Sequence, residues 1–297
     1  MLKEWPLVAF TIAGQMAVGA FLFLFPPLFL SSAGTEWNSI VRGWVLVVWG
    51  MTFGLVAAAA ALSFFHLHHP FRARRVLTNL RTSWLSREIF FELAFMALVA
   101  LAFVLVWTDH TTGLFLRAVM AAAALAAILF LISMCRVYTL ESVPPWDSVY
   151  TGASFFLTAA TLGAMATAWV TEAPLINSYS NISWPWTASL VFVALDGLVA
   201  VLLTPQYGMT GFRSRPSLRP PSRAHRALYL GRLGLLAGGL TLIVLAMSAR
   251  QHFILAVGVL GPVEGSGSIL AVAFVLVLFG EIANRFLFYG LVPRPGD

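Results

Sequence analysis

The chain has 297 residues, of which 60% are hydrophobic and only 10% are charged, and its mean hydropathy is +0.87. Because ordinary soluble domains contain about 25% charged residues, this composition excludes a soluble globular protein. Its apolar runs are continuous and long enough for transmembrane helices of about 20 residues, whereas a membrane β-barrel would show alternating segments of about 10 residues. The sequence therefore predicts an all-α, polytopic integral membrane protein.

Eight apolar segments are predicted to be transmembrane helices, and together they form a single membrane domain over residues 1–297. The segments span residues 6–30, 41–65, 88–107, 114–138, 151–171, 186–204, 228–249 and 267–290. With eight spans, both termini lie on the same side of the membrane, called face A below. The first apolar run is too long for the core of a signal peptide, so we expect a retained first helix.

The basic residues are distributed unevenly between the two faces. Of the 18 Lys and Arg residues, 15, including Arg232, fall on or near face A, and only Arg42, Arg117 and Arg250 fall near the opposite face B. By the positive-inside rule, face A and both termini are predicted to be cytoplasmic. The formal net charge of +6 therefore reflects membrane orientation, and we expect no nucleic-acid partner.

The segment 205–227 is rich in Arg, Pro and Ser, which predicts an irregular basic loop on the cytoplasmic side. Two interpretations remain open for its positive charges. They either set the orientation of the neighbouring helices, or they bind anionic membrane lipids or acidic partners.

Redox cofactors have few candidate ligands in this sequence. All six histidines lie at predicted helix ends or in loops, whereas an embedded haem needs ligands that face each other across helices. The single cysteine, Cys135, cannot hold an iron–sulfur cluster alone. We therefore expect no haem, no iron–sulfur cluster and no metal in the protein.

Polar side chains gather where the predicted helices reach face A. His66 ends the second span and Glu88 opens the third, so an imidazole and a carboxylate that exchange protons near neutral pH share one connecting loop. Each residue also has a simpler explanation as a group that interacts with a helix dipole. Arg136 and Tyr138, at the end of the fourth span, fit either an interfacial anchor or a site.

Several further polar residues lie inside the predicted spans. Glu281 and Arg285 are four residues apart, which predicts an ion pair within one helix. Asp196 is predicted near the membrane midplane with no identifiable partner, and Gln15 lies one-third along the first span. An ionisable group inside a membrane has a large free-energy cost, so its presence suggests a specific role. Both a structural and a functional role remain open for Asp196.

Five stretches of the sequence resemble the membrane anchor subunit of the dimethyl sulfoxide reductase family. They are EWPLVAFTIAGQ, HLHHPFRA, LSREI, RVYTLESVPPW and GEIANRFLFYG. The resemblance extends from end to end, although spans five to seven match only by hydropathy. It implies a protein of the bacterial inner membrane whose partners are a ferredoxin-like iron–sulfur subunit and a molybdopterin catalytic subunit.

The resemblance also implies electron exchange with membrane quinone, either menaquinone or ubiquinone. In the family, the histidine after the second span and the glutamate that opens the third belong to the quinol site, and they correspond to His66 and Glu88. The further candidates are Arg72, Arg136, Tyr138, Gln15 and Arg285.

The sequence departs from the family in two respects. HLHHP replaces a small, Gly-containing stretch, and the basic residues share face A with the quinone motifs, so the partners are expected on the cytoplasmic face. That arrangement is similar to sulfite dehydrogenase complexes, in which electrons flow from sulfite to quinone. Two alternatives remain: a small-solute transporter, which helices interrupted at the midplane would support, and a purely structural anchor.

Overall fold

The computed structural model describes residues 5–32, 37–66, 79–139, 146–171, 184–202, 223–257 and 266–290. Side chains are not described at residues 40, 63–66, 171, 250–257 and 266. In these segments the regular structure is entirely helical apart from turns, and all eight helices are long and apolar enough to cross a membrane. The predicted all-α membrane fold is thus confirmed.

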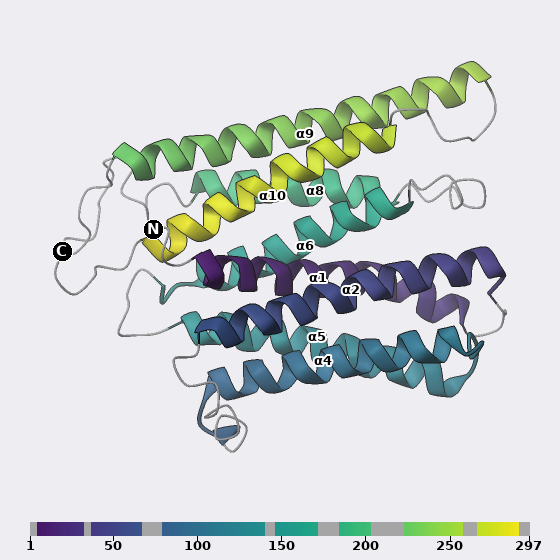
Figure 1. The fold of residues 1–297 in the computed structure, drawn as a ribbon. Coiled ribbons are helices and arrows are strands. Elements are labelled where there is room, and N and C mark those ends of the chain that lie inside the picture. The colour runs from purple at the N-terminus through teal and green to yellow at the C-terminus, as the bar shows by residue number, and fades with distance from the viewer. Residues whose placement is uncertain are drawn as a thin grey trace.

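The eight helices run roughly parallel or antiparallel to one another, as Figure 1 shows. Their bounds are α1 Trp5–Ser31, α2 Ser39–His66, α4 Trp84–Trp107, α5 Leu114–Tyr138, α6 Val149–Thr171, α8 Trp184–Leu202, α9 Arg223–Val257 and α10 Ser266–Gly290. The first residue of α1 and the last of α10 lie at the same end of the molecule, which is face A (Figure 1).

Local sequence signals explain several helix boundaries. The side chain of Ser83 accepts a hydrogen bond from the backbone N–H of Ser86, so α4 begins with a capped first turn four residues before the predicted span. Pro185 occupies the first turn of α8, where its missing N–H costs no helical hydrogen bond. Pro26 and Pro27 lie inside α1, which nevertheless continues to Ser31.

Helix α9 begins earlier than the sequence indicated. The predicted loop extended to residue 227, but residues 223–227 form the first turn of α9. The reason is local: the last proline, Pro221, precedes this stretch, and the alanines that follow favour helix. The rest of the predicted loop, 205–222, lies outside the described residues.

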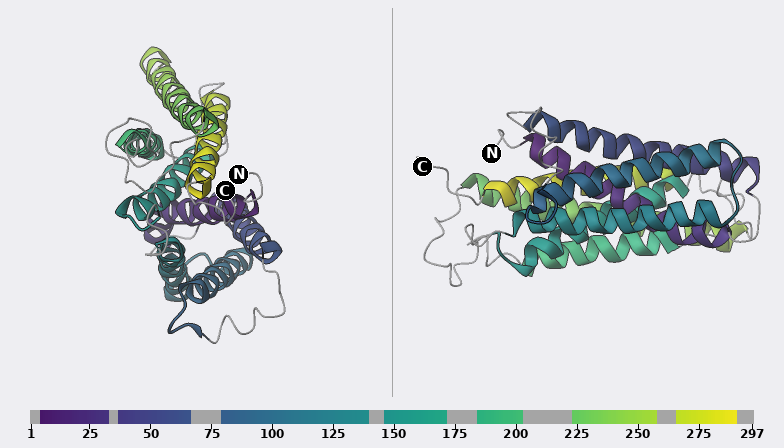
Figure 2. Two further views of the ribbon diagram at one scale, coloured as in Figure 1. Left: turned by 90° about the vertical axis from the view of Figure 1, so that its left-hand side faces the viewer. Right: turned by 90° about the horizontal axis from the view of Figure 1, so that it is seen from below.

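The helices form two rings of four, one from each half of the sequence. Helices α1, α2, α4 and α5 contact one another in cyclic order, and so do α6, α8, α9 and α10. In the end-on view of Figure 2, left, the helices of each ring follow one another in chain order, and they do so in the same rotational direction in both rings. The rings join through α1, which contacts α6 and α10, and through α5, which contacts α6.

Where α1 of one ring crosses α6 of the other, glycine packs against glycine. A Cβ added at Gly19 would lie 1.9 Å from the carbonyl oxygen of Ala159, and one added at Gly163 would lie 2.3 Å from the carbonyl carbon of Gly19. No side chain fits at either position, so α1 and α6 cross with their backbones in contact, as small residues allow in membrane proteins. This crossing holds the two rings together.

Candidate functional site

Gln15 and Arg285 meet in the interior, where α1 faces α10. Nη2 of the fully buried Arg285 donates hydrogen bonds to Gln15 Oε1 at 2.8 Å and to Thr158 Oγ1 at 3.0 Å. The guanidinium carbon lies 3.8 Å from the centre of the Phe155 ring, which is a cation–π contact. Gln15 Nε2 in turn donates to Met134 Sδ at 3.4 Å. Two predicted site residues are therefore in direct contact.

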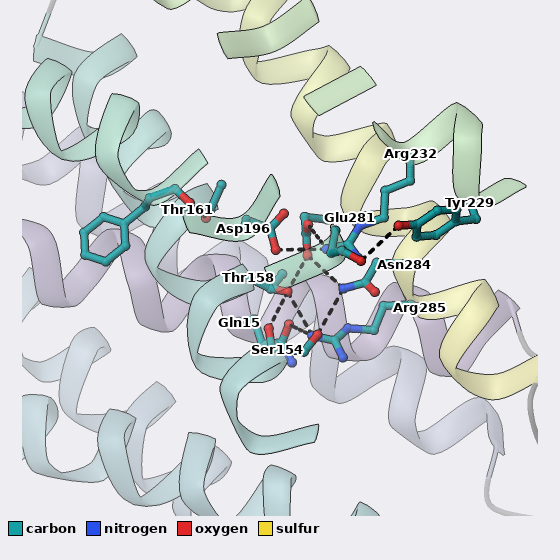
Figure 3. A network of polar contacts seen from close by, with 12 residues as sticks. Gln15, Ser154, Thr158, Thr161, Asp196, Tyr229, Arg232, Glu281, Asn284 and Arg285 are labelled. Atoms are coloured by element: carbon teal, nitrogen blue, oxygen red, sulfur yellow. Dashed lines mark hydrogen bonds and ion pairs between the residues drawn. The ribbon is translucent and has the colours of Figure 1, made fainter. Parts of the chain in front are cut away.

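Arg232 joins the two other intramembrane carboxylates. Its Nη2 donates to Asp196 Oδ1 at 2.9 Å and lies 3.4 Å from Glu281 Oε1, and all three side chains are at most 1% exposed (Figure 3). The predicted ion pair between Glu281 and Arg285 is wrong, because α9 presents a second arginine to Glu281 while Arg285 bonds to α1 and α6. Arg232 itself, expected near the surface of face A, lies nine residues inside α9.

Hydrogen bonds link these groups into one buried network, which Figure 3 shows. Thr158 Oγ1 donates to Glu281 Oε2, and Asn284 Nδ2 donates to Ser154 Oγ at 3.1 Å. With Asp196, Arg232 and Arg285, the network holds two carboxylates and two guanidinium groups. Their formal charges cancel, which satisfies the rule that charges inside a membrane are paired.

The network lies in the half of the membrane domain nearer face A. Asp196 is six residues before the end of α8, and Glu281 is nine residues before the end of α10. At about 1.5 Å per residue, these positions are roughly 9 and 14 Å from the helix ends. Asp196 lies three residues past the middle of the described part of α8, on the face A side.

Glu88 lies on the core-facing side of α4, together with a second carboxylate, Glu92, four residues later. Both side chains are only 2% exposed, and Oε1 of each has no hydrogen-bond partner among the described residues. Glu88 lies in the neighbourhood of Cys135 and Tyr138 of α5 and of Tyr289 of α10. The predicted site residue therefore faces the interior between α5 and α10.

An aromatic cluster covers this region at face A. The Tyr138 ring centre lies 5.4–5.8 Å from those of Trp146, Phe155, Phe288 and Tyr289. Trp146 Nε1 also donates to the backbone carbonyl of Phe288 at 3.0 Å. The cluster brings the motifs RVYTLESVPPW and GEIANRFLFYG into contact, although they are far apart in the sequence.

The remaining predicted residues lie elsewhere or outside the described part of the protein. Arg136 is exposed, and its guanidinium carbon is 5.7 Å from the centre of the Trp84 ring, so it points away from the buried groups. His66 is the last residue of α2, as predicted, but its side chain is not described. Arg72 lies wholly outside the described residues.

Two functional candidates were missed by the sequence analysis, and each had a detectable signal. Glu92 follows Glu88 at the four-residue spacing that places side chains on one helix face. Arg232 is a single charge within the long apolar run of α9, but the misplaced loop boundary put it near a helix end. Asn284, Ser154 and Thr158 had no such signal, because polar uncharged residues are common in membrane helices.

The arrangement provides three chemical capabilities in the half of the membrane domain nearer face A. Glu88 and Glu92 can accept or release protons, and their unpartnered oxygens can bind a hydrogen-bonding ligand. Arg285 has two further donors, Nε and Nη1, without partners among the described residues. Within the described segments, no group of three or more His, Cys, Asp or Glu residues could hold a metal ion.

Comparison with known proteins identifies the family of this protein. The model of the DMSO reductase anchor subunit (DmsC) family matches residues 1–211. The sequence is 27% identical to anaerobic dimethyl sulfoxide reductase chain YnfH of Escherichia coli K12, over 97% of this sequence and 94% of that protein. It is also 32% identical to the C subunit of sulfite dehydrogenase from Allochromatium vinosum, over about half of each protein.

A third relative has the same degree of similarity over nearly the full length. The C chain of anaerobic dimethyl sulfoxide reductase from Escherichia coli K12 is 27% identical over 97% of this sequence and 94% of that protein. No solved structure matches the sequence. The protein has eight helices long and apolar enough to cross a membrane. Since the family model matches more than two-thirds of the sequence, the chain belongs to the DMSO reductase anchor subunit family.

Proposed function

We propose that this protein is the quinone-reactive membrane anchor of a molybdopterin and iron–sulfur oxidoreductase. It passes electrons between the quinone pool and a ferredoxin-like iron–sulfur subunit, which serves a molybdopterin subunit that carries the substrate chemistry. The observation that carries the proposal is the convergence of Gln15, Glu88, Tyr138 and Arg285, from four helices, in the interior near face A. Family membership supports the role as an anchor.

The chemistry of a quinone suits this location. Its ring oxygens need hydrogen bonds and protons, whereas its isoprenoid tail stays in the lipid. Arg285 offers unpartnered donors to a ring oxygen, and Glu88 offers a carboxylate for proton exchange. His66, at the end of α2, and Arg72, outside the described residues, are further candidates that the family resemblance implies. The quinone itself carries the electrons, so the proposal requires no haem, cluster or metal within this protein.

We further propose that face A is cytoplasmic, in a bacterial inner membrane, and that both partner subunits dock there. The excess of Lys and Arg on this face supports the orientation. The similarity to a sulfite dehydrogenase subunit supports sulfite as a substrate of the complex, with dimethyl sulfoxide-type reduction as the second candidate. The direction of electron flow follows from the potentials of substrate and quinone.

The arrangement of the helices weighs against the transporter alternative. Transporter sites near the midplane are typically formed by interrupted helices. The described spanning helices are continuous, including α1 with its two prolines, and Asp196, Glu281 and Arg232 are paired with one another.

Glu88→Gln in the complex purified with its partners tests the proposed function. We expect quinol-linked turnover to fall by roughly 100-fold, the scale of a lost proton-transfer group, while the partners stay bound. His66→Ala should also reduce turnover strongly. Asp109→Asn is the matched control, because this exposed carboxylate lies beyond the face B end of α4, paired with Arg42. Unchanged turnover in Glu88→Gln would favour the purely structural anchor.

A further inference from the structure

The four carboxylates buried in the described part of the membrane domain fall into two kinds. Asp196 and Glu281 share Arg232, and their network also contains Arg285. Glu88 and Glu92 form no ion pair with any described residue, although both are only 2% exposed. The first kind is explained by charge compensation within the fold, whereas the second kind is not.

Glu92 occupies a position where the fold alone would favour an apolar side chain. It lies on the core-facing stripe of α4, and the next residues on that stripe are Phe95, Val99, Ala102 and Val106. Transfer of an isolated ionised carboxylate into such surroundings is very costly unless it is paired or takes up a proton. Since no cation among the described residues pairs with it, a proton is the available counter-charge.

The spacing along α4 connects Glu92 to Glu88. Residues four apart on a helix have Cβ atoms about 5–6 Å from each other, so their carboxyl groups can exchange a proton directly or through one water molecule. Glu88 is four residues and Glu92 eight residues after Trp84, the first residue of α4. The pair therefore extends from about 6 Å to about 12 Å below the end of the helix at face A.

We propose that Glu92 is a second proton-transfer residue of the quinone site and works in series with Glu88. Glu92 exchanges a proton with the ring oxygen of the quinone that lies deeper in the membrane, and Glu88 relays that proton toward face A. This inference rests on the proposed quinone function.

The relay accounts for both protons that are released when quinol is oxidised. Oxidation of one quinol to quinone breaks two O–H bonds and releases two protons and two electrons. The electrons pass to the iron–sulfur subunit, and the two protons leave through Glu92 and Glu88. Quinone reduction uses the same groups in reverse: two electrons arrive from the iron–sulfur subunit, and two protons are delivered to the ring oxygens.

Turnover of Glu92 variants in the assembled complex tests the relay. Glu92→Gln keeps the size and hydrogen-bonding capacity of the side chain but cannot carry a proton, and we expect quinol oxidation to fall at least tenfold. Glu92→Asp should retain an intermediate rate. The double variant Glu88→Gln/Glu92→Gln should be within about threefold of the slower single variant, because the two residues act in one series.

Two further measurements separate proton transfer from a structural effect. A tight quinol-analogue inhibitor should bind Glu92→Gln within about threefold of the wild-type affinity, and the solvent deuterium isotope effect on turnover should rise. Thr167→Val, which removes a buried polar group of α6, is the control and should leave both values unchanged. Loss of inhibitor binding together with turnover would overturn the relay, because it would show that Glu92 shapes the site instead.

The outcomes distinguish the relay from the function on which it rests. A wild-type rate in Glu92→Gln, while Glu88→Gln is slow, would refute the relay and leave the quinone function intact. A wild-type complex that shows no quinone-linked turnover would refute both.

Discussion

At the scale of single residues, the buried charges of the second ring depend on one another. Asp196 and Glu281 both contact Arg232, and the formal charges of the network cancel only when Arg285 is included. Breaking a buried pair by removal of one partner is strongly destabilising, because the remaining charge has neither water nor a full counter-charge. Removal of one charged side chain from the network should therefore destabilise the protein, whereas removal of two opposite charges together should destabilise it less.

Asp196→Asn should lower the free energy of unfolding by about 3–5 kcal/mol. The single cysteine, Cys135, is buried and supplies the measurement, since a thiol-reactive fluorescent dye labels it only as the protein unfolds. Asp196→Asn/Arg232→Gln, which restores neutrality, should be more stable than Asp196→Asn alone. If the two substitutions simply add, the charges are not coupled.

At this scale the sequence identified several of the buried polar residues but not the partners that they contact. Gln15, Glu88, Tyr138 and Arg285 were identifiable because they are polar groups in apolar spans or in recognisable motifs. Their partners were not, because side-chain pairing depends on which helices face each other. Arg285 therefore contacts Gln15, 270 residues away in sequence, rather than the nearby Glu281.

At the scale of helices, the contact between α1 and α6 depends on the absence of two side chains. Gly19 and Gly163 are each the fifteenth residue of their helix, and their backbones touch. The membrane provides no hydrophobic driving force between helices, so close packing of this kind contributes much of the association. The crossing also sets the distance between Gln15 on α1 and Thr158 on α6, both of which bind Arg285.

Gly163→Ala should force α1 and α6 apart and cost about 1–3 kcal/mol, the usual range for overpacking. Gly152→Ala in the same helix is the control, because an added Cβ there meets nothing within 4 Å. The Cys135 labelling midpoint should fall in the first variant and stay unchanged or rise slightly in the second. Equal midpoints would show that the crossing relaxes without cost.

The helices themselves were well predicted, and their packing was not. Long apolar runs identify spans because a bilayer demands about 20 apolar residues regardless of neighbours. The errors came at the ends: the Ser83 cap extends α4, and residues 223–227 continue α9 beyond the predicted loop boundary. The Gly19–Gly163 contact had no signal in the sequence, since small residues occur throughout these spans.

At the scale of the whole molecule, the two halves of the sequence repeat one arrangement. Each half contributes four helices in cyclic contact, and the two first helices of the rings, α1 and α6, pack against each other (Figure 2). The sequence contains no obvious repeat, so this correspondence emerges only from the structure. Among the described residues, the buried carboxylates without an ion pair belong to the first ring, and the paired ones belong to the second.

Orientation in the membrane is a property of the whole molecule, and reporter fusions test it. Alkaline phosphatase requires disulfides that form outside the cytoplasm, so a fusion after Asp297 should be inactive if face A is cytoplasmic. A fusion in the connection between α4 and α5, at face B, should be active. The opposite pattern would place face A outside the cytoplasm.

The confinement of Glu88 and Glu92 to the face A half of the molecule has an electrical consequence. One elementary charge that crosses the whole membrane exchanges about 2.3 kcal/mol with a potential of 100 mV. A proton that moves between Glu92 and face A covers about 12 of the roughly 30 Å of the hydrocarbon core, so it exchanges only about 0.9 kcal/mol. The proposed proton transfer along α4 should therefore sense about two-fifths of the membrane potential rather than all of it.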